Sequence, residues 1–143
     1  MAEFWEALGA RPHLARTLAR HVESLGDGSV PRRTKELVAL MVAWLNACEN
    51  CLETHGEAAV QLGVDAATLE ALGDFAHSPH YRPAERAALA AAVALTREPR
   101  ALPTPVRDEL ERYYDAGEIV EIVAAIGLYN YLTRANNALT SFP

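Results

Sequence analysis

The chain contains two cysteines, Cys48 and Cys51, and His55 follows them in a largely apolar segment, at spacings of three and four residues. On an α-helix such spacings place side chains on one face, along consecutive turns. Two thiols near a helix start can close a disulfide, and the helix dipole favours a thiolate on one of them. An imidazole one turn beyond the second thiol can accept its proton. The spacing therefore predicts an activated thiolate beside a resolving thiol.

Two other interpretations of these residues remain open. A cysteine pair on an apolar helix can be inert packing, and two thiolates and an imidazole are also ligands for zinc or iron, with His77 or His80 as a fourth. Neither histidine completes a convincing ligand set, so we expect no metal and no cofactor beyond a redox-active disulfide. We also expect a partly wet helix start, with Cys48 the more exposed sulfur, because polar residues surround it: Asn46, Glu49, Asn50, Glu53 and Thr54.

Glu36 can join this group only if the chain reverses direction. In one straight helix it would lie about 28 Å from His55, at roughly 1.5 Å per residue, too far for a proton relay. A reversal near Leu45 and Asn46 would make two antiparallel helices, and Asn46 tolerates the left-handed conformation that such a turn needs. Glu36 would then orient His55 and hold its tautomer. The alternative is a solvated glutamate in the first turn of its helix.

Composition and periodicity predict an all-α fold in a single domain, residues 1–143. Half of the residues are apolar, and Gly and Pro lie between periodic runs. Apolar spacing predicts helical segments over 2–25, 30–46, 47–63, 65–75, 84–98, 104–117 and 117–140, with Asp65 as an N-cap and Pro99 as a stop. Two stripes are expected to be buried: Leu14, Leu18, Val22 and Leu25 in the first segment, and Leu37, Leu40, Met41, Trp44 and Leu45 in the second.

Charge and hydropathy narrow the possible partners. The net charge is −6, and the 13 Lys and Arg residues form no basic block, so we expect no nucleic-acid partner. No apolar run reaches the ~18 residues of a membrane span, and we expect a soluble, cytoplasmic protein. The last helix is apolar around most of its circumference from Ile119 to Leu132, which predicts a core helix or a subunit interface and favours a homo-oligomer.

The pattern of Glu36, eleven residues, Cys48-x-x-Cys51, three residues and His55 resembles a known active-site motif. It is similar, at every spacing, to that of the alkylhydroperoxidase D-like (AhpD-like) members of the carboxymuconolactone decarboxylase family. The segments "AERAALAAAVALT" and "EIVEIVAAIGLYNYLTRANNAL" resemble the helices that follow the motif, including an Asn and an Arg, here Asn130 and Arg134. The resemblance covers residues 15–140.

The resemblance implies a thiol-dependent peroxidase that reduces hydroperoxides through a Cys48–Cys51 disulfide, with Glu36 and His55 as a proton relay. It implies a dithiol reductant such as a lipoyl or thioredoxin-like protein, and assembly into a homotrimer or homohexamer. Some relatives carry a His where this chain has Asn50, which implies a lower peroxidase rate here. Two alternatives remain: a decarboxylase-like enzyme acting on a small organic acid with His55 as base, and a redox sensor using the same disulfide.

Overall fold

The computed structural model describes residues 2–98 and 100–142, and in these residues it contains helices and no strand. The all-α prediction is thus confirmed for the described part of the chain, whereas the expected helix stop at Pro99 lies outside it. The elements are α1 (Ala2–Gly9), α2 (Pro12–Ser24), the 3-10 turn η1 (Leu25–Asp27), α3 (Arg32–Leu45), α4 (Glu49–Gln61), α5 (Ala66–Glu70), the 3-10 turn η2 (Ala71–Asp74), α6 (Pro83–Arg97), α7 (Thr104–Tyr113) and α8 (Ala116–Leu139).

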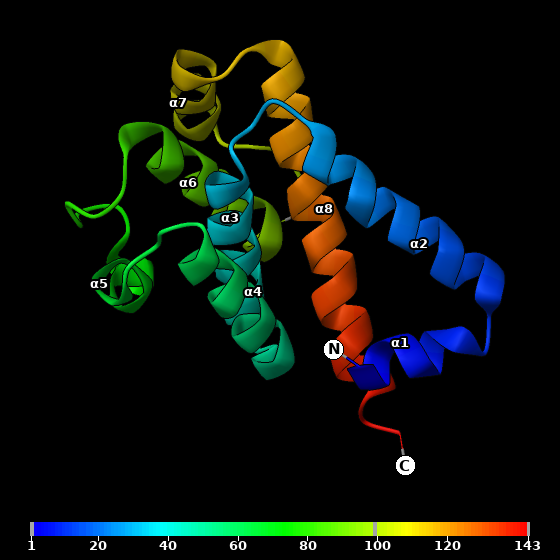
Figure 1. Ribbon diagram of the computed structural model, residues 1–143. Helices are drawn as coiled ribbons and strands as arrows, with labels where there is room; N and C mark the ends of the chain where they lie inside the picture. Colours follow the sequence, from blue (N-terminus) through cyan, green and yellow to red (C-terminus); the bar gives the residue numbers. More distant parts are fainter. Residues whose placement is uncertain (1, 99, 143) are drawn as a thin grey trace.

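Helix α3 is the centre of the molecule and packs against α4, α6 and α8 (Figure 1). Every residue from Thr34 to Ala43 is buried, on all sides of the helix. Aliphatic side chains of α3, α6 and α8 form the main core around it. This burial also includes Lys35 and Glu36, so both charged side chains need partners from other segments.

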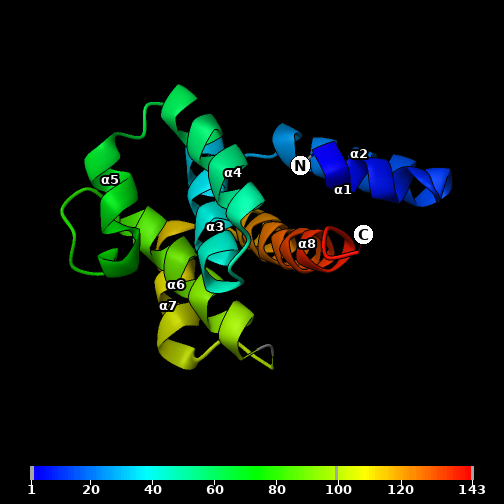
Figure 2. The ribbon, with the colours of Figure 1, turned by 90° about the horizontal axis from the view of Figure 1, so that it is seen from below.

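The N-terminal helices form an arm on the outer side of α8. In Figure 2, α1 and α2 lie beside α8, on the side of the molecule away from α5, α6 and α7. A second apolar cluster joins the arm to α8, and it consists of Phe4, Leu8, Leu18, Leu128 and Leu132. The arm therefore adds a layer beside α8.

Two of the expected buried stripes are only partly buried. Leu14 and Val22 are 48% and 40% exposed, and Leu18 is the buried residue of α2. Trp44 is 48% exposed. It lies at the end of α3 in a groove beside α4 and the α5–η2 segment, which covers only part of the indole.

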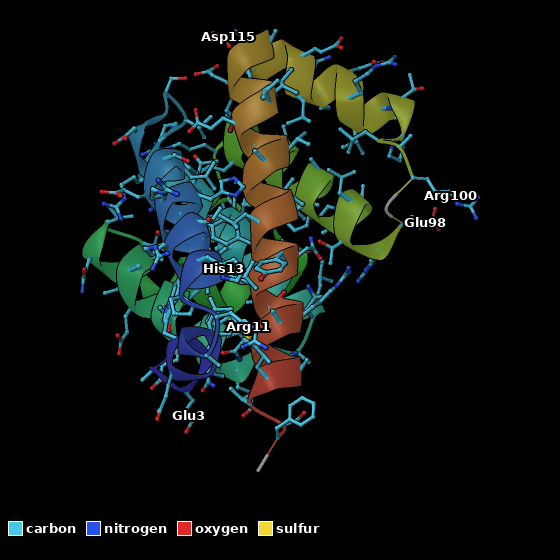
Figure 3. All side chains as sticks on the ribbon, turned by 90° about the vertical axis from the view of Figure 1, so that its right-hand side faces the viewer. Glu3, Arg11, His13, Glu98, Arg100 and Asp115 are labelled. Carbon is cyan, nitrogen blue, oxygen red and sulfur yellow. A yellow bond between two sulfur atoms is a disulfide. The ribbon has the colours of Figure 1, made fainter. Side chains whose placement is uncertain are left out.

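Acidic side chains cap the starts of two helices. Asp65 caps α5 as expected, accepting a hydrogen bond from the Thr68 amide at 2.7 Å. Asp115 caps α8 and forms a reciprocal pair with Glu118, at 2.8 and 2.9 Å, and Figure 3 shows Asp115 at the start of that helix. Pro31 directly precedes α3, as its N-cap residue.

Helix α8 buries one side and leaves an apolar stripe uncovered. Ile122, Ile126 and Leu132 are buried, whereas Val120 and Tyr131 are 69% and 49% exposed. Among the described helices, none combines the length and the apolar character that a membrane crossing requires. The expected homo-oligomer, which would cover such a stripe, stays a prediction.

A buried ion pair joins α3 to α8. Lys35 Nζ lies 2.5 Å from Glu121 Oε1 and also donates to the backbone oxygen of Leu25. Burial alone would raise the pKa of Glu121, but the Lys35 hydrogen bond and the Val30 amide outweigh it and leave the pKa below its usual value. At Gly28 a Cβ atom would lie 2.1 Å from the Glu121 carboxylate, so the loop before α3 passes too close for a side chain.

Glu121→Leu is expected to lower the free energy of unfolding by about 3 kcal/mol, because it leaves the Lys35 ammonium buried without an anion. Denaturant titration at neutral pH measures this loss. The matched control is Glu109→Leu, which breaks an exposed pair with Arg112 at 2.9 Å and should cost less than about 1 kcal/mol. Equal losses for the two variants would contradict the structural importance of the buried pair.

The same pair predicts a pH dependence. Since the pKa of Glu121 in the folded state lies below its usual value of 4.5, the stabilisation is complete above that value. It is lost as the pH falls through the lower folded-state pKa. The difference in unfolding free energy between the wild type and Glu121→Leu should therefore shrink on acidification below about pH 4.5, and a constant difference would argue against an ionised Glu121.

Candidate active site

A tight reversal between α3 and α4 builds the site. Helix α3 ends at Leu45 and α4 begins at Glu49, and the Cys48 amide donates to the Ala43 carbonyl at 2.9 Å. The reversal lies where the sequence predicted it, but its left-handed residue is Ala47, at φ 51°, and not Asn46, at φ −94°. A non-glycine residue in this conformation costs about 1–2 kcal/mol, so neighbouring contacts must hold the turn.

Side chains from α8 supply those contacts. Asn46 Nδ2 donates to Asn130 Oδ1 at 3.1 Å and to Thr133 Oγ1 at 2.9 Å, and Asn137 Nδ2 donates to the Asn46 carbonyl at 2.9 Å. Asn130 Nδ2 in turn donates to Thr96 Oγ1 at 2.9 Å. Asn46 therefore acts through its side chain, as the anchor that ties the reversal to the last helix.

The reversal brings Glu36 and His55 together. Glu36 Oε2 lies 2.7 Å from His55 Nδ1, although 19 residues separate the two in sequence. The carboxylate accepts the hydrogen bond from Nδ1–H, so the neutral ring presents Nε2 as its basic nitrogen. The His55 ring also meets the Tyr129 ring edge to face, with centroids 5.2 Å apart. A carboxylate and an aromatic ring thus fix both the tautomer and the orientation of the imidazole.

Cys48 and Cys51 form a disulfide with an S–S distance of 2.06 Å. Both are buried, at 0% and 2% exposure, so the expectation that Cys48 is the more exposed sulfur is wrong. The expected partly wet helix start is confirmed, because Glu49 and Glu53 are exposed. Cys48 is the N-cap of α4, in an extended conformation, and its side chain turns inward against Ala43. Cys51 lies one turn before His55 on α4, as the spacing predicted.

A cavity of about 270 Å³ opens beside the Glu36–His55 pair. Its walls come from the N-terminal arm, α3, α4 and α8, and its lining residues are Trp5, Val22, Leu25, Gly26, Arg32, Lys35, Glu36, Thr54, His55, Tyr129 and Leu132. Burial, and to a lesser extent the Glu36 charge, raises the pKa of Tyr129, so its phenol stays neutral. The cavity offers a mostly apolar chamber with one carboxylate–imidazole pair in its wall.

Several residues of the site could not be assigned from the sequence. Trp5 lines the cavity from α1, although a place in the core or an interface is the usual role of such an aromatic. Asn136 Nδ2 donates to Cys48 Sγ at 3.4 Å. In the sequence, Asn136 is one of the polar residues of "RANN" near the end of the last helix, and nothing distinguishes it there from Asn137.

The histidines considered as extra metal ligands lie elsewhere. His77 is on the surface, with its side chain 85% exposed, and pairs with Asp74 at 2.8 Å. Over residues 2–98 and 100–142, no group of three or more His, Cys, Asp or Glu side chains is arranged to hold a metal ion.

The model of the carboxymuconolactone decarboxylase family matches residues 12–94, which include the whole motif from Glu36 to His55. This chain belongs to the carboxymuconolactone decarboxylase family. Among curated proteins, this family member is 27% identical to the uncharacterized protein YdfG of Bacillus subtilis, over 79% of this chain and 78% of YdfG. It is 30% identical to the uncharacterized protein YnjA of Escherichia coli, over 73% of this chain and 58% of YnjA.

Solved structures share the fold of this family member. A protein of unknown function from Agrobacterium tumefaciens, provisionally described as the antioxidant defence protein AhpD, superposes with a TM-score of 0.87 at 23% identity, over 94% of this chain and 93% of that one. The debrominase Bmp8 superposes with a TM-score of 0.84 at 30% identity, over 94% of this chain and 73% of Bmp8. The fold of this chain is therefore AhpD-like.

Ala47→Gly is expected to raise the free energy of unfolding of the oxidised protein by about 1 kcal/mol, because glycine adopts the left-handed conformation without strain. Denaturant titration measures the gain. Ala58→Gly, within α4, is the matched control and should lose about 1 kcal/mol, because glycine there lowers helix propensity. A loss at position 47 as large as that at position 58 would show that Ala47 is not strained.

Proposed function

We propose that this protein is a thiol-dependent peroxidase that reduces small organic hydroperoxides through its Cys48–Cys51 pair. The observation that carries the proposal is the 2.7 Å contact between Glu36 and His55, one helical turn from a closed disulfide. A carboxylate-oriented imidazole is the usual device for taking a proton from a thiol. The apolar cavity beside it suits the organic part of a hydroperoxide.

The cycle has three balanced steps. One cysteine thiolate attacks a peroxide oxygen, the O–O bond breaks, and the leaving alkoxide takes a proton to become an alcohol while the cysteine becomes a sulfenic acid. The second thiolate attacks that sulfur, the S–S bond forms, and hydroxide leaves and is protonated to water. An external dithiol then reduces the disulfide and is itself oxidised. The role of His55, oriented by Glu36, is to hold and return the proton.

The partners in this proposal follow from the chemistry. A lipoyl or thioredoxin-like protein would supply the dithiol, and a cytoplasmic setting would keep the reduced form populated. A homotrimer or homohexamer would cover the exposed apolar stripe of α8. No step of the proposed cycle needs a metal ion or an organic cofactor.

Reductive debromination is a second candidate. It is favoured by the similarity to the debrominase Bmp8, of which a cysteine-to-alanine variant has been crystallised with 2,3,4-tribromopyrrole. The chamber of this chain has aromatic walls from Trp5 and Tyr129, which suit a small aromatic ring. A thiolate would take the bromine as Br⁺, the ring carbon would accept a proton, and the second thiolate would displace bromide to form the disulfide.

The first test is intact-mass spectrometry of the reduced protein before and after one equivalent of an alkyl hydroperoxide, with free thiols counted. We expect loss of two hydrogens and of both thiols. Continued consumption of peroxide with excess dithiol would separate an enzyme from a redox sensor, which would oxidise once and change assembly. Unchanged mass and free thiols would reject the peroxidase proposal, and the same assay with a bromopyrrole would then test the second candidate.

Variants test the roles of the residues. Cys48→Ser and Cys51→Ser should each abolish multiple turnover, and His55→Ala should slow it by about 100-fold or more, because it removes the proton acceptor. Glu36→Gln should slow it less than His55→Ala, and the exposed Glu53→Gln on α4 is its matched control. Peroxide consumption that survives loss of both thiols would exclude the disulfide cycle, and an acid substrate decarboxylated by that double variant would favour the decarboxylase alternative.

A further inference from the structure

The buried side-chain amide of a residue in the last helix contacts one sulfur of the disulfide. Asn136, on α8, is 2% exposed, and its Nδ2 lies 3.4 Å from Sγ of Cys48, which is itself fully buried. The two residues are 88 positions apart. The contact therefore depends on the packing of α8 against the α3–α4 turn.

Packing alone does not explain an asparagine at this position. In the described part of the chain, Asn136 Oδ1 is buried without a hydrogen-bond partner. A buried polar atom without a partner destabilises a protein, whereas an aliphatic side chain of similar size would avoid this cost. What the amide provides in exchange is an N–H donor beside Cys48 Sγ.

Few other groups around Cys48 could stabilise a negative charge on its sulfur. Cys48 is the N-cap of α4, so the amide groups of the first turn of the helix favour negative charge near it. A polar cavity on this side is lined by Ala47, Glu49, Asn50, Asn136, Asn137, Thr140 and Ser141. Glu49 is the charged member of that set and is negative, and from α3 the sulfur meets Ala43. The nearest imidazole along α4, His55, follows Cys51 instead.

We propose that Asn136 is a positioning residue of the disulfide, whose Nδ2–H stabilises the negative charge on Cys48 Sγ whenever the S–S bond opens or closes. The inference rests on the dithiol–disulfide cycle of the proposed function. A hydrogen bond to a thiolate is stronger than one to a neutral disulfide sulfur, so the contact favours the reduced form. Asn136 thereby makes the disulfide easier to reduce.

The reductive step assigns the two sulfurs different roles. A thiolate of the external dithiol attacks Cys51 Sγ, a new S–S bond forms to Cys51, and the Cys48–Cys51 bond breaks with its electron pair on Cys48 Sγ. Cys48 leaves as the thiolate that Asn136 contacts. The second thiolate of the reductant then attacks the reductant's own sulfur in the mixed disulfide, and Cys51 leaves and takes a proton from His55 or solvent.

The test compares Asn136→Leu with the wild type and with Asn137→Leu. Leucine has a similar size to asparagine but no donor. Asn137 is the next residue on α8 and donates to the Asn46 carbonyl at 2.9 Å, so its variant loosens the same turn without removing the donor to sulfur. Circular dichroism of each variant checks folding, and Asn136→Ala replaces Asn136→Leu if leucine does not fit.

Two measurements are made on each protein. The reduction potential is obtained by equilibration with glutathione redox buffers above the pKa of Cys48, and the thiol pKa from thiolate absorbance of the reduced form. Asn136→Leu should raise the pKa of Cys48 by about one unit and make the disulfide about tenfold harder to reduce, a potential about 30 mV more negative. Asn137→Leu should leave both values near those of the wild type.

Unchanged values in Asn136→Leu, or equal shifts in the two variants, would overturn the inference. Neither measurement uses peroxide, so a failure of the inference about Asn136 can be told apart from a failure of the proposed function. A shifted potential in a protein that consumes no peroxide would support the role of Asn136 and reject the peroxidase. Normal peroxide turnover with an unshifted potential in Asn136→Leu would support the peroxidase and reject the role of Asn136.

Discussion

The reversal between α3 and α4 is the constraint on which the site depends. Three residues turn the chain, one of them in the left-handed conformation at Ala47. That single turn makes the helices antiparallel, brings Glu36 to His55, and places Cys48 at the cap of α4. The turn is held by its own backbone hydrogen bonds and by the contacts of Asn46 with polar side chains of α8, so the last helix of the chain supports the geometry of a motif that lies far before it.

The central helix carries two consecutive charged residues through the core, and each has a partner from a different direction. Lys35 meets Glu121 of α8, whereas Glu36 meets His55 of α4. An unpaired charge in the core is costly. The first contact therefore holds α8 against α3, and the second holds α4 against α3. The groups proposed for proton transfer are thereby also part of what holds the helices together.

The sequence predicted the contact of Glu36 with His55 on condition that the chain reversed near Asn46, and it left a solvated Glu36 as the alternative. The structure contains the reversal and the contact. The helical class was equally predictable from periodicity. The burial of the cysteines was not, since local polarity around Cys48 says nothing about α8 packing over it. Asn136 and Trp5 could not be placed for the same reason: their roles arise from contacts between segments that the chain brings together only in three dimensions.

The cavity draws its walls from two parts of the chain with different relations to the family. The carboxylate–imidazole pair lies within the matched residues 12–94, whereas Trp5 lies before them, in the short helix α1. Most of the residues that line the cavity lie inside the matched stretch, and Trp5, Tyr129 and Leu132 lie outside it. The wall that Trp5 contributes lies far in sequence from the reactive pair, so a substitution at this one position would reshape the chamber without touching Glu36, His55 or the turn that joins their helices.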